Sequence, residues 1–282
     1  MAVEDKNIEQ RMNALSESKA KLLEKLLKEQ KKKKRKYFQD RAGTSRIPGR
    51  KKALEELPCS YMQKKFWYVE QMNPNSIAYN ISGYVHFKGK LNTGCLKAAL
   101  SEVIKREEAL RSCFVEKNGS LVVQLKEVDV DTIYQERNCT AREYDEVERE
   151  KMMVEEGRIP FALEKGDLIR LVCYQFSETD WIGQIVMHHI VSDGYSSGVI
   201  IKELLSIYEQ LVEKRYRGMV APEIQYYDYV MYENRQIRDN KYQDQLNYWV
   251  ESLSGSVMKC EIPSDFQVKD VVTYQGDRVL FH

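Results

Sequence analysis

The chain has 282 residues, of which 43% are hydrophobic and 31% are charged, enough for one large or two small globular domains. Its formal net charge of +1 points to neither a nucleic-acid nor a membrane partner, and no apolar run reaches the roughly 20 residues that span a bilayer. The six cysteines are scattered without a C-x-x-C pair and no signal-peptide pattern opens the chain, which favours a reduced, cytoplasmic protein.

The first 50 residues differ in charge from the rest. Residues 1–50 hold 15 Lys or Arg and 7 Asp or Glu, a net charge of +8, whereas residues 51–282 have a net charge of −7. We expect residues 16–36 to form an amphipathic helix that has a leucine stripe and ends in the basic run 31–36. This run is typical of a solvated helix end, of a nuclear-localisation or nucleic-acid patch, or of a docking helix for an acidic partner. We therefore expect a basic helical arm and linker over 1–50, a candidate docking segment, ahead of a globular domain over 51–282.

Within the globular domain, strands and helices alternate. Period-two patterns predict a strand at 81–87 and hairpins around Asn118-Gly119 and around residues 177–180. Thr93 is the expected N-cap of a helix that carries Leu110. Further helices are expected at 141–157, 198–215 and 224–252. This mixed order is typical of an α/β or α+β layer built on one sheet.

The best candidates for catalytic residues lie at the end of a predicted strand. Two adjacent histidines, His188 and His189, end this strand, and an Asp-Gly turn and a helix follow. Adjacent side chains point to opposite faces of a strand, so only one imidazole can easily face a given cleft. A neutral imidazole can take a proton near pH 7, as an amine or thiol attacking an acyl group requires. We expect Asp193 to form a buried ion pair with an arginine, and the N–H of Gly194 could donate to a developing oxyanion.

The histidine pair also fits a purely structural role. A metal site is less favoured, because adjacent histidines rarely converge on one ion and the H-E-x-x-H spacing is absent from the sequence. His86 lies within a predicted strand and His282 is terminal, so neither offers a better base. The sequence contains no glycine-rich phosphate-binding motif, so nucleotide binding has no support.

The segment 188–194 matches H-H-x-x-x-D-G, the signature of nonribosomal peptide synthetase condensation domains. Residues 60–71 (SYMQKKFWYVEQ) resemble the family's opening motif S-x-A-Q-x-R-L-W-x-L-x-Q, and residues 106–114 (REEALRSCF) resemble R-H-E-x-L-R-T-x-F. Later segments match in the family's order, namely residues 160–170, 225–232, 248–249 and 262–265. The resemblance runs from about residue 54 to the end and indicates the N-terminal lobe of such a domain.

This resemblance implies a chloramphenicol acetyltransferase-like lobe of layered α/β (α+β) class, with a mixed sheet flanked by helices. It implies amide bond formation between acyl or peptidyl and aminoacyl thioesters, both carried on the 4'-phosphopantetheine of donor and acceptor peptidyl carrier proteins, in secondary-metabolite biosynthesis. It implies no directly bound cofactor or metal. The further implied partners are a second condensation lobe, which we expect to be absent from residues 1–282, and an upstream synthetase subunit that docks on the N-terminal helix. Neither nucleic acid nor a membrane is implied.

Carried over to this sequence, the family's catalytic residue is His189, acting as a base or positioning the amine. The residues that would shape or support the site are His188, Asp193, Gly194, Arg106 and Arg111. This sequence departs from the family pattern where Glu107 replaces a histidine and Tyr195 a tryptophan. Three alternatives remain: a stand-alone chloramphenicol acetyltransferase-like acyltransferase, a non-catalytic carrier-docking module, and an epimerising relative.

Overall fold

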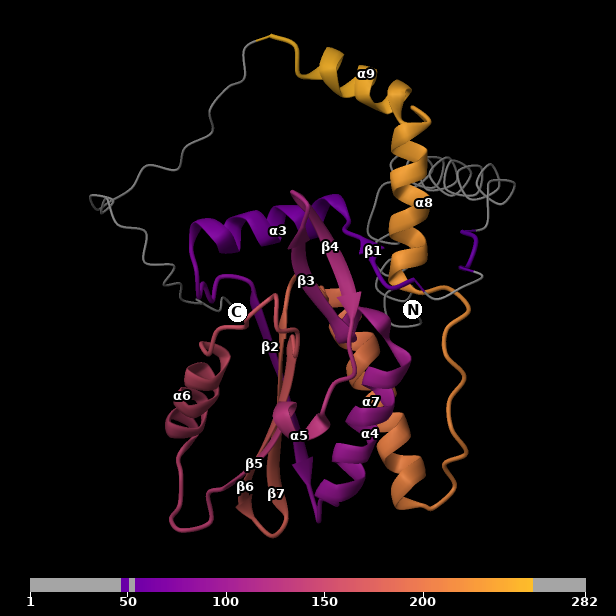
Figure 1. Cartoon of the computed structure of the whole chain (residues 1–282). Helices are drawn as coiled ribbons and strands as arrows, with labels where there is room; N and C mark the ends of the chain where they lie inside the picture. Colours follow the sequence, from indigo (N-terminus) through magenta and orange to yellow (C-terminus); the bar gives the residue numbers. More distant parts are fainter. Residues whose placement is uncertain (1–46, 51–53, 256–282) are drawn as a thin grey trace, which may run out of the picture. The chain divides into compact units, whose positions relative to one another are not determined.

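A computed structural model describes residues 47–50 and 54–255 of the chain (Figure 1). The unit that begins at Pro48 contains all the elements discussed below. The expected arm helix at 16–36 and the motif at 262–265 lie outside the described residues. In the described part of the chain, no helix is both long enough and apolar enough to cross a bilayer.

Three strands form a small antiparallel sheet in the order β1-β4-β3. They are β1 (Leu57–Pro58), β3 (Ser112–Lys117) and β4 (Ser120–Leu125). Asn118 and Gly119 join β3 to β4 with φ angles of 53° and 75°. A two-residue hairpin turn needs positive φ at both positions, which Asn and Gly tolerate best. The hairpin predicted from the Asn-Gly pair is thus confirmed.

A second sheet has the order β2-β7-β6-β5. Its strands are β2 (Asn80–Lys88), β5 (Tyr134–Asn138), β6 (Ile169–Ser177) and β7 (Asp180–His188). Among these described strands only the β5–β6 pair is parallel, so the sheet is mixed. The strand and the hairpin predicted here are confirmed, but the expectation of one sheet is wrong because β1, β3 and β4 pair only with one another in the described residues.

Helices cover both faces of the four-stranded sheet (Figure 1). Figure 1 shows α4 (Thr93–Arg106) and α7 (Gly194–Val212) side by side on one face and α6 (Glu146–Gly157) on the other. The alternation of side chains along β6 matches this layering. Leu171 and Cys173 belong to the main core, whereas Val172 and Tyr174 belong to a second apolar cluster. Both faces of the central strand β7 are therefore buried.

The other helical elements connect the sheets and surround the site. They are α3 (Tyr61–Met72), η1 (Glu108–Arg111), α5 (Val130–Ile133), α8 (Tyr226–Arg238) and α9 (Gln243–Ser252). Helix starts differ from expectation by one to five residues because polar caps set them. Asn92 rather than Thr93 caps α4, Asp145 caps α6, and Asp193 starts α7 at Gly194 rather than at Gly198. Leu110 lies in η1, outside α4.

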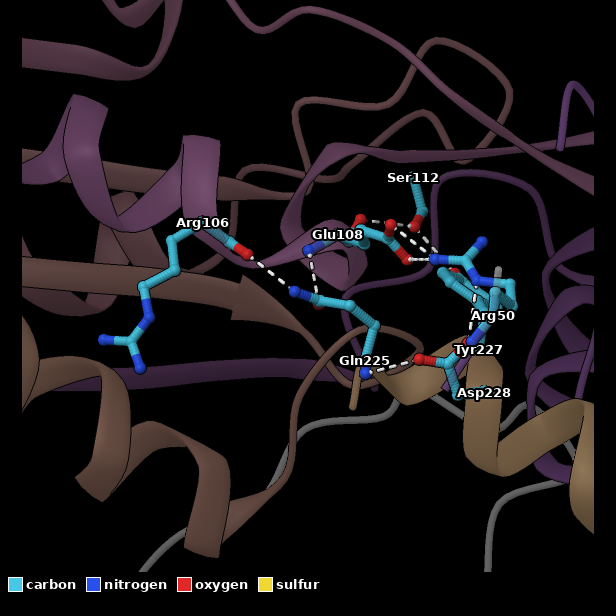
Figure 2. Close-up of polar contacts among 7 residues, drawn as sticks. All are labelled: Arg50, Arg106, Glu108, Ser112, Gln225, Tyr227 and Asp228. Carbon is cyan, nitrogen blue, oxygen red and sulfur yellow. Dashed lines mark hydrogen bonds and ion pairs between the residues drawn. The ribbon is translucent and has the colours of Figure 1, made fainter. Parts of the chain in front are cut away.

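A polar network attaches the start of α8 to η1 (Figure 2). The Arg50 guanidinium binds Glu108 and donates from Nε to Asp228 Oδ1 at 2.8 Å. Gln225 donates from Nε2 to the carbonyl of Arg106 at 2.9 Å and accepts at Oε1 from the N–H of Glu108. These contacts hold α8 against the segment that links α4 to β3.

Candidate active site

A cavity of about 490 Å³ lies next to the end of β7. Its walls come from α3, from residues 107–110, from the loop after β7, from α7 and from the first residue of α8. These segments are far apart in sequence, and the network around Arg50 and Asp228 helps to bring them together. The wall is mostly apolar, with a few polar groups that include the imidazole of His189. Such a surface suits an apolar ligand whose reacting atoms meet a small number of polar groups.

His189 is the histidine in the cavity wall. Its backbone N–H donates to the carbonyl of Tyr79 at 2.8 Å, which ties the loop to the segment before β2. Its ring stacks on Phe66 of α3, with the ring centroids 5.1 Å apart and the planes inclined by 26°. The stacking and the backbone hydrogen bond together fix the orientation of this ring relative to α3 and to the segment before β2.

His188 lies in the protein core and is 1% exposed. Its Nδ1 accepts from the N–H of Ile190 at 3.0 Å, so the neutral ring is assigned its proton on Nε2. The rings of Tyr79 and Phe161 contact it edge-on. Burial, with a smaller contribution from the charge of His189, lowers the pKa of His188 to about 4. His188 is thus a neutral structural group near pH 7, and the two histidines separate as the strand geometry predicts.

Asp193 differs from expectation. We predicted a buried ion pair with an arginine, but among the described residues its carboxylate pairs with none, and this side chain is exposed. Instead, Oδ1 accepts from the N–H and the hydroxyl of Ser196 at 2.7 and 2.6 Å, capping α7. These hydrogen bonds hold the pKa of Asp193 below its usual value. The cap satisfies the carboxylate because the helix N-terminus offers free N–H donors.

Gly194 is the first residue of α7 and follows the cap directly. A Cβ placed on it would meet no atom of the described chain within 4 Å. This distance leaves out its chain neighbours and the nearby backbone of α7, and Gly194 itself is not among the described residues of the cavity wall.

Arg106 lies behind the cavity wall, at the end of α4. Its guanidinium is 3.0 Å from Glu203 of α7 and 3.6 Å from Glu107, and both carboxylates line the cavity. Burial and the neighbouring charge of Glu203 raise the pKa of Glu107, the residue that departs from the family's histidine. Arg111 is only partly buried and is not among the described residues of the cavity wall; its carbonyl accepts from the N–H of Lys126. Of the two arginines expected to support the site, only Arg106 therefore contacts residues of the cavity wall.

Of the predicted site residues, only His189 and Asp193 lie in the cavity wall, and the wall residues that the sequence did not assign to the site include Gln63, Phe66 and Tyr226. The signal for Gln63 and Phe66 was their place in the opening motif at 60–71. Periodicity predicts that such residues are buried but not that they face the histidine loop.

Two of the buried cysteines, Cys59 and Cys173, are poor nucleophiles. Burial raises the pKa of the Cys59 and Cys173 thiols to about 12, so both stay protonated at neutral pH. Within residues 47–50 and 54–255, no three His, Cys, Asp or Glu side chains converge as a metal ion requires. The described residues of the cavity wall include one imidazole, that of His189.

The chain therefore has a layered α/β fold, with His189 in the wall of a cavity beside the end of β7. Residues 53–282 match the family model described as "Condensation domain". The chain therefore belongs to the condensation domain family, which confirms the resemblance seen in the sequence.

Individual relatives agree with this assignment. The chain is 31% identical over 240 residues to a linear gramicidin synthase from Brevibacillus parabrevis, a match that covers 83% of this chain and 5% of that protein. It is 29% identical over 225 residues to surfactin synthase subunit 1 of Bacillus subtilis (strain 168), covering 79% and 6%. The chain thus spans only a small part of the length of these synthetases.

Solved structures share the fold. The starter condensation domain of rhizomide synthetase RzmA superposes with a TM-score of 0.64 at 20% identity, covering 71% of this chain and 48% of that one. The X-domain from teicoplanin biosynthesis superposes with a TM-score of 0.69 at 20% identity, covering 79% and 48%. The predicted condensation-type fold is therefore confirmed, and the chain corresponds to about half of each solved chain.

Proposed function

We propose that this chain is part of a condensation domain that joins an acyl or peptidyl thioester to an aminoacyl thioester, both carried on the phosphopantetheine arms of carrier proteins. The acceptor amine attacks the donor carbonyl, a C–N bond forms, and the C–S bond breaks. The proton lost by the amine ends on the departing thiol. One observation carries the proposal: a family-matched chain places His189, and not His188, in the wall of a cavity.

In this proposal His189 takes the amine proton or holds the amine in line with the donor carbonyl. A ring fixed by stacking on Phe66 is suited to either role, because a fixed orientation lowers the cost of reaching the reactive geometry. The N–H of Gly194 is proposed to donate to the oxyanion, since the space beside this residue is open. Asp193 and His188 shape the loop, the first by capping α7 and the second from the core.

The reaction class can be tested with donor and acceptor supplied in different forms. A condensation domain containing residues 48–282 and a second lobe would be mixed with a panel of acyl and aminoacyl groups, either on carrier proteins or as CoA thioester and free amine. We expect mass spectrometry to detect the amide product only when both groups are carrier-bound. Acyl transfer from CoA to free amines at the same rate would instead establish a stand-alone acyltransferase, and carrier binding without transfer would establish a docking module.

We also propose that residues 1–50 form a docking segment for an upstream synthetase subunit. The net charge of +8 on this segment, against −7 on the rest, supports an acidic partner surface. Removing residues 1–46 should lower the affinity for that partner roughly tenfold at low salt, measured by calorimetry. Amide formation from premixed carriers should not change. Equal affinity of the two chains would contradict the docking role.

A further inference from the structure

We propose that Gln63 is a positioning residue, whose side-chain amide holds the carbonyl of Ile190 and thereby the imidazole of His189. The inference deepens the proposed function, because it concerns the loop that carries the proposed catalytic group. It also gives a structural role to the opening motif at 60–71, none of whose residues takes part in the proposed reaction.

The Gln63 amide joins three parts of the fold. The side chain belongs to α3 and is 2% exposed. Its Oε1 accepts from the backbone N–H of Ser60 at 3.0 Å. Its Nε2 donates to the carbonyl of Ile190 at 3.3 Å and to the hydroxyl of Tyr227 at 3.4 Å. One buried amide thus connects α3 to the histidine loop and to α8.

Neighbouring groups allow only one orientation of this amide. The carbonyl of Glu108 can only accept, so the hydroxyl of Ser112, at 3.0 Å, donates to it. Tyr227 then donates to Ser112 Oγ at 2.6 Å (Figure 2). Its oxygen is left to accept from Gln63. If the amide were flipped, its NH₂ group would face the N–H of Ser60 and its oxygen would face the carbonyl of Ile190. Because each donor has an acceptor in a single arrangement, Gln63 is held in the orientation that supports the loop.

The peptide groups next to His189 are fixed from several sides. The N–H of Ile190 donates to the ring of His188, and its carbonyl accepts from Gln63. The N–H of His189 itself donates to Tyr79. Phe66 lies three residues after Gln63 on α3 and stacks on the His189 ring, so one face of this helix contacts both backbone and imidazole. Helix α3 therefore acts as the support of the catalytic ring, and Gln63 is its backbone contact.

Two substitutions separate positioning from helix capping. Gln63→Glu keeps an oxygen that accepts from the Ser60 N–H, since Glu is a usual residue at this place of a capping box. It replaces the amide donor by an oxygen that faces the Ile190 carbonyl. Ser60→Ala is the matched control, because it removes the hydroxyl that accepts from the Gln63 N–H and from the hydroxyl of Tyr226, while leaving the amide on the loop.

The test measures backbone hydrogen exchange and turnover for the wild-type protein and both variants, each as a condensation domain that contains this chain and a second lobe. For Gln63→Glu we expect peptides covering residues 188–193 to exchange roughly tenfold faster, and kcat to fall roughly tenfold with little change in KM. For Ser60→Ala we expect a lower Tm but exchange in this loop and a kcat close to the wild-type values.

Two results would overturn the inference: unchanged loop exchange in Gln63→Glu, or equal loosening of the loop in Ser60→Ala. The exchange measurement does not depend on activity. If the wild-type protein forms no amide, the proposed function fails, and exchange still decides the role of Gln63.

Discussion

His188 and His189 are neighbours in the chain but have opposite surroundings. One ring is enclosed by Tyr79 and Phe161 and accepts a backbone hydrogen bond, while the other forms part of a cavity wall. Strand geometry predicts such a division, since successive side chains leave a strand on opposite faces. Which ring faces which side follows from the residues that pack around them, and these come from distant segments. The sequence alone supported the assignment of His189 only through the family motif.

The buried histidine makes stability depend on pH. The pKa of His188 is about 4 in the folded protein and near 6.5 in an unfolded chain, so between these values only the unfolded state gains the proton. The free energy of unfolding should therefore fall as the pH drops from about 6.5 to about 4, by roughly 3 kcal/mol, and the contribution is fully present above pH 6.5.

His188→Asn tests this pH effect, because its side-chain oxygen can still accept from Ile190 but does not titrate. Urea unfolding between pH 4 and pH 7.5 should show a smaller loss of stability for this variant than for the wild-type protein. An identical loss in both proteins would show that other groups cause it.

At the scale of elements, the start of α7 shows how one carboxylate sets the loop geometry. Asp193 begins the helix four residues earlier than the apolar pattern predicts, because its side chain accepts the N–H of Ser196. The Asn-Gly hairpin and the strands of the four-stranded sheet were predictable, since turn residues and period-two patterns are local signals. The division into two sheets was not, because strand pairing depends on contacts between distant segments.

Helix capping and an arginine ion pair predict different effects of substitution at Asp193. Asp193→Ala should lower the free energy of unfolding by about 1 kcal/mol, because the first turn of α7 loses its acceptor. Asp193→Asn keeps a side-chain oxygen and should stay within about 0.5 kcal/mol of the wild-type protein. Chemical denaturation measures both. If Asn were as harmful as Ala, the charge would matter more than the cap, and an ion pair would explain the site better.

At the scale of the whole molecule, the site depends on segments that are far apart in the chain. Arg50 binds Glu108 and Asp228, residues more than a hundred positions apart (Figure 2). This network places the start of α8, and with it Tyr226 of the cavity wall, against η1. No local pattern in the sequence predicts such a contact, and neither Arg50 nor Asp228 was expected to matter for the site. The family motifs predicted that the segments of Glu108 and Asp228 belong to one domain, whereas Arg50 was expected in the N-terminal arm and instead lies in the unit that begins at Pro48.

Arg50→Ala should be strongly destabilising. It leaves the Asp228 carboxylate, whose side chain is only 3% exposed, without its cation, and we expect a loss of about 3 kcal/mol. The control is Lys90→Ala, which breaks an exposed pair with Glu178 and should change stability by less than about 1 kcal/mol. Both values come from urea unfolding at pH 7. Equal, small effects of the two substitutions would contradict a structural role for the Arg50 network.

The most direct test of the central claim is single-turnover amide formation by a condensation domain that carries His189→Ala. The donor and acceptor are loaded on carrier proteins, and the mass of the acceptor carrier is followed over time. The account predicts that the amide product forms at least about 100-fold more slowly than with the wild-type domain, as expected for loss of a general base, while the Tm changes little. A variant that forms the product at the wild-type rate would contradict the assignment of His189 as the catalytic residue.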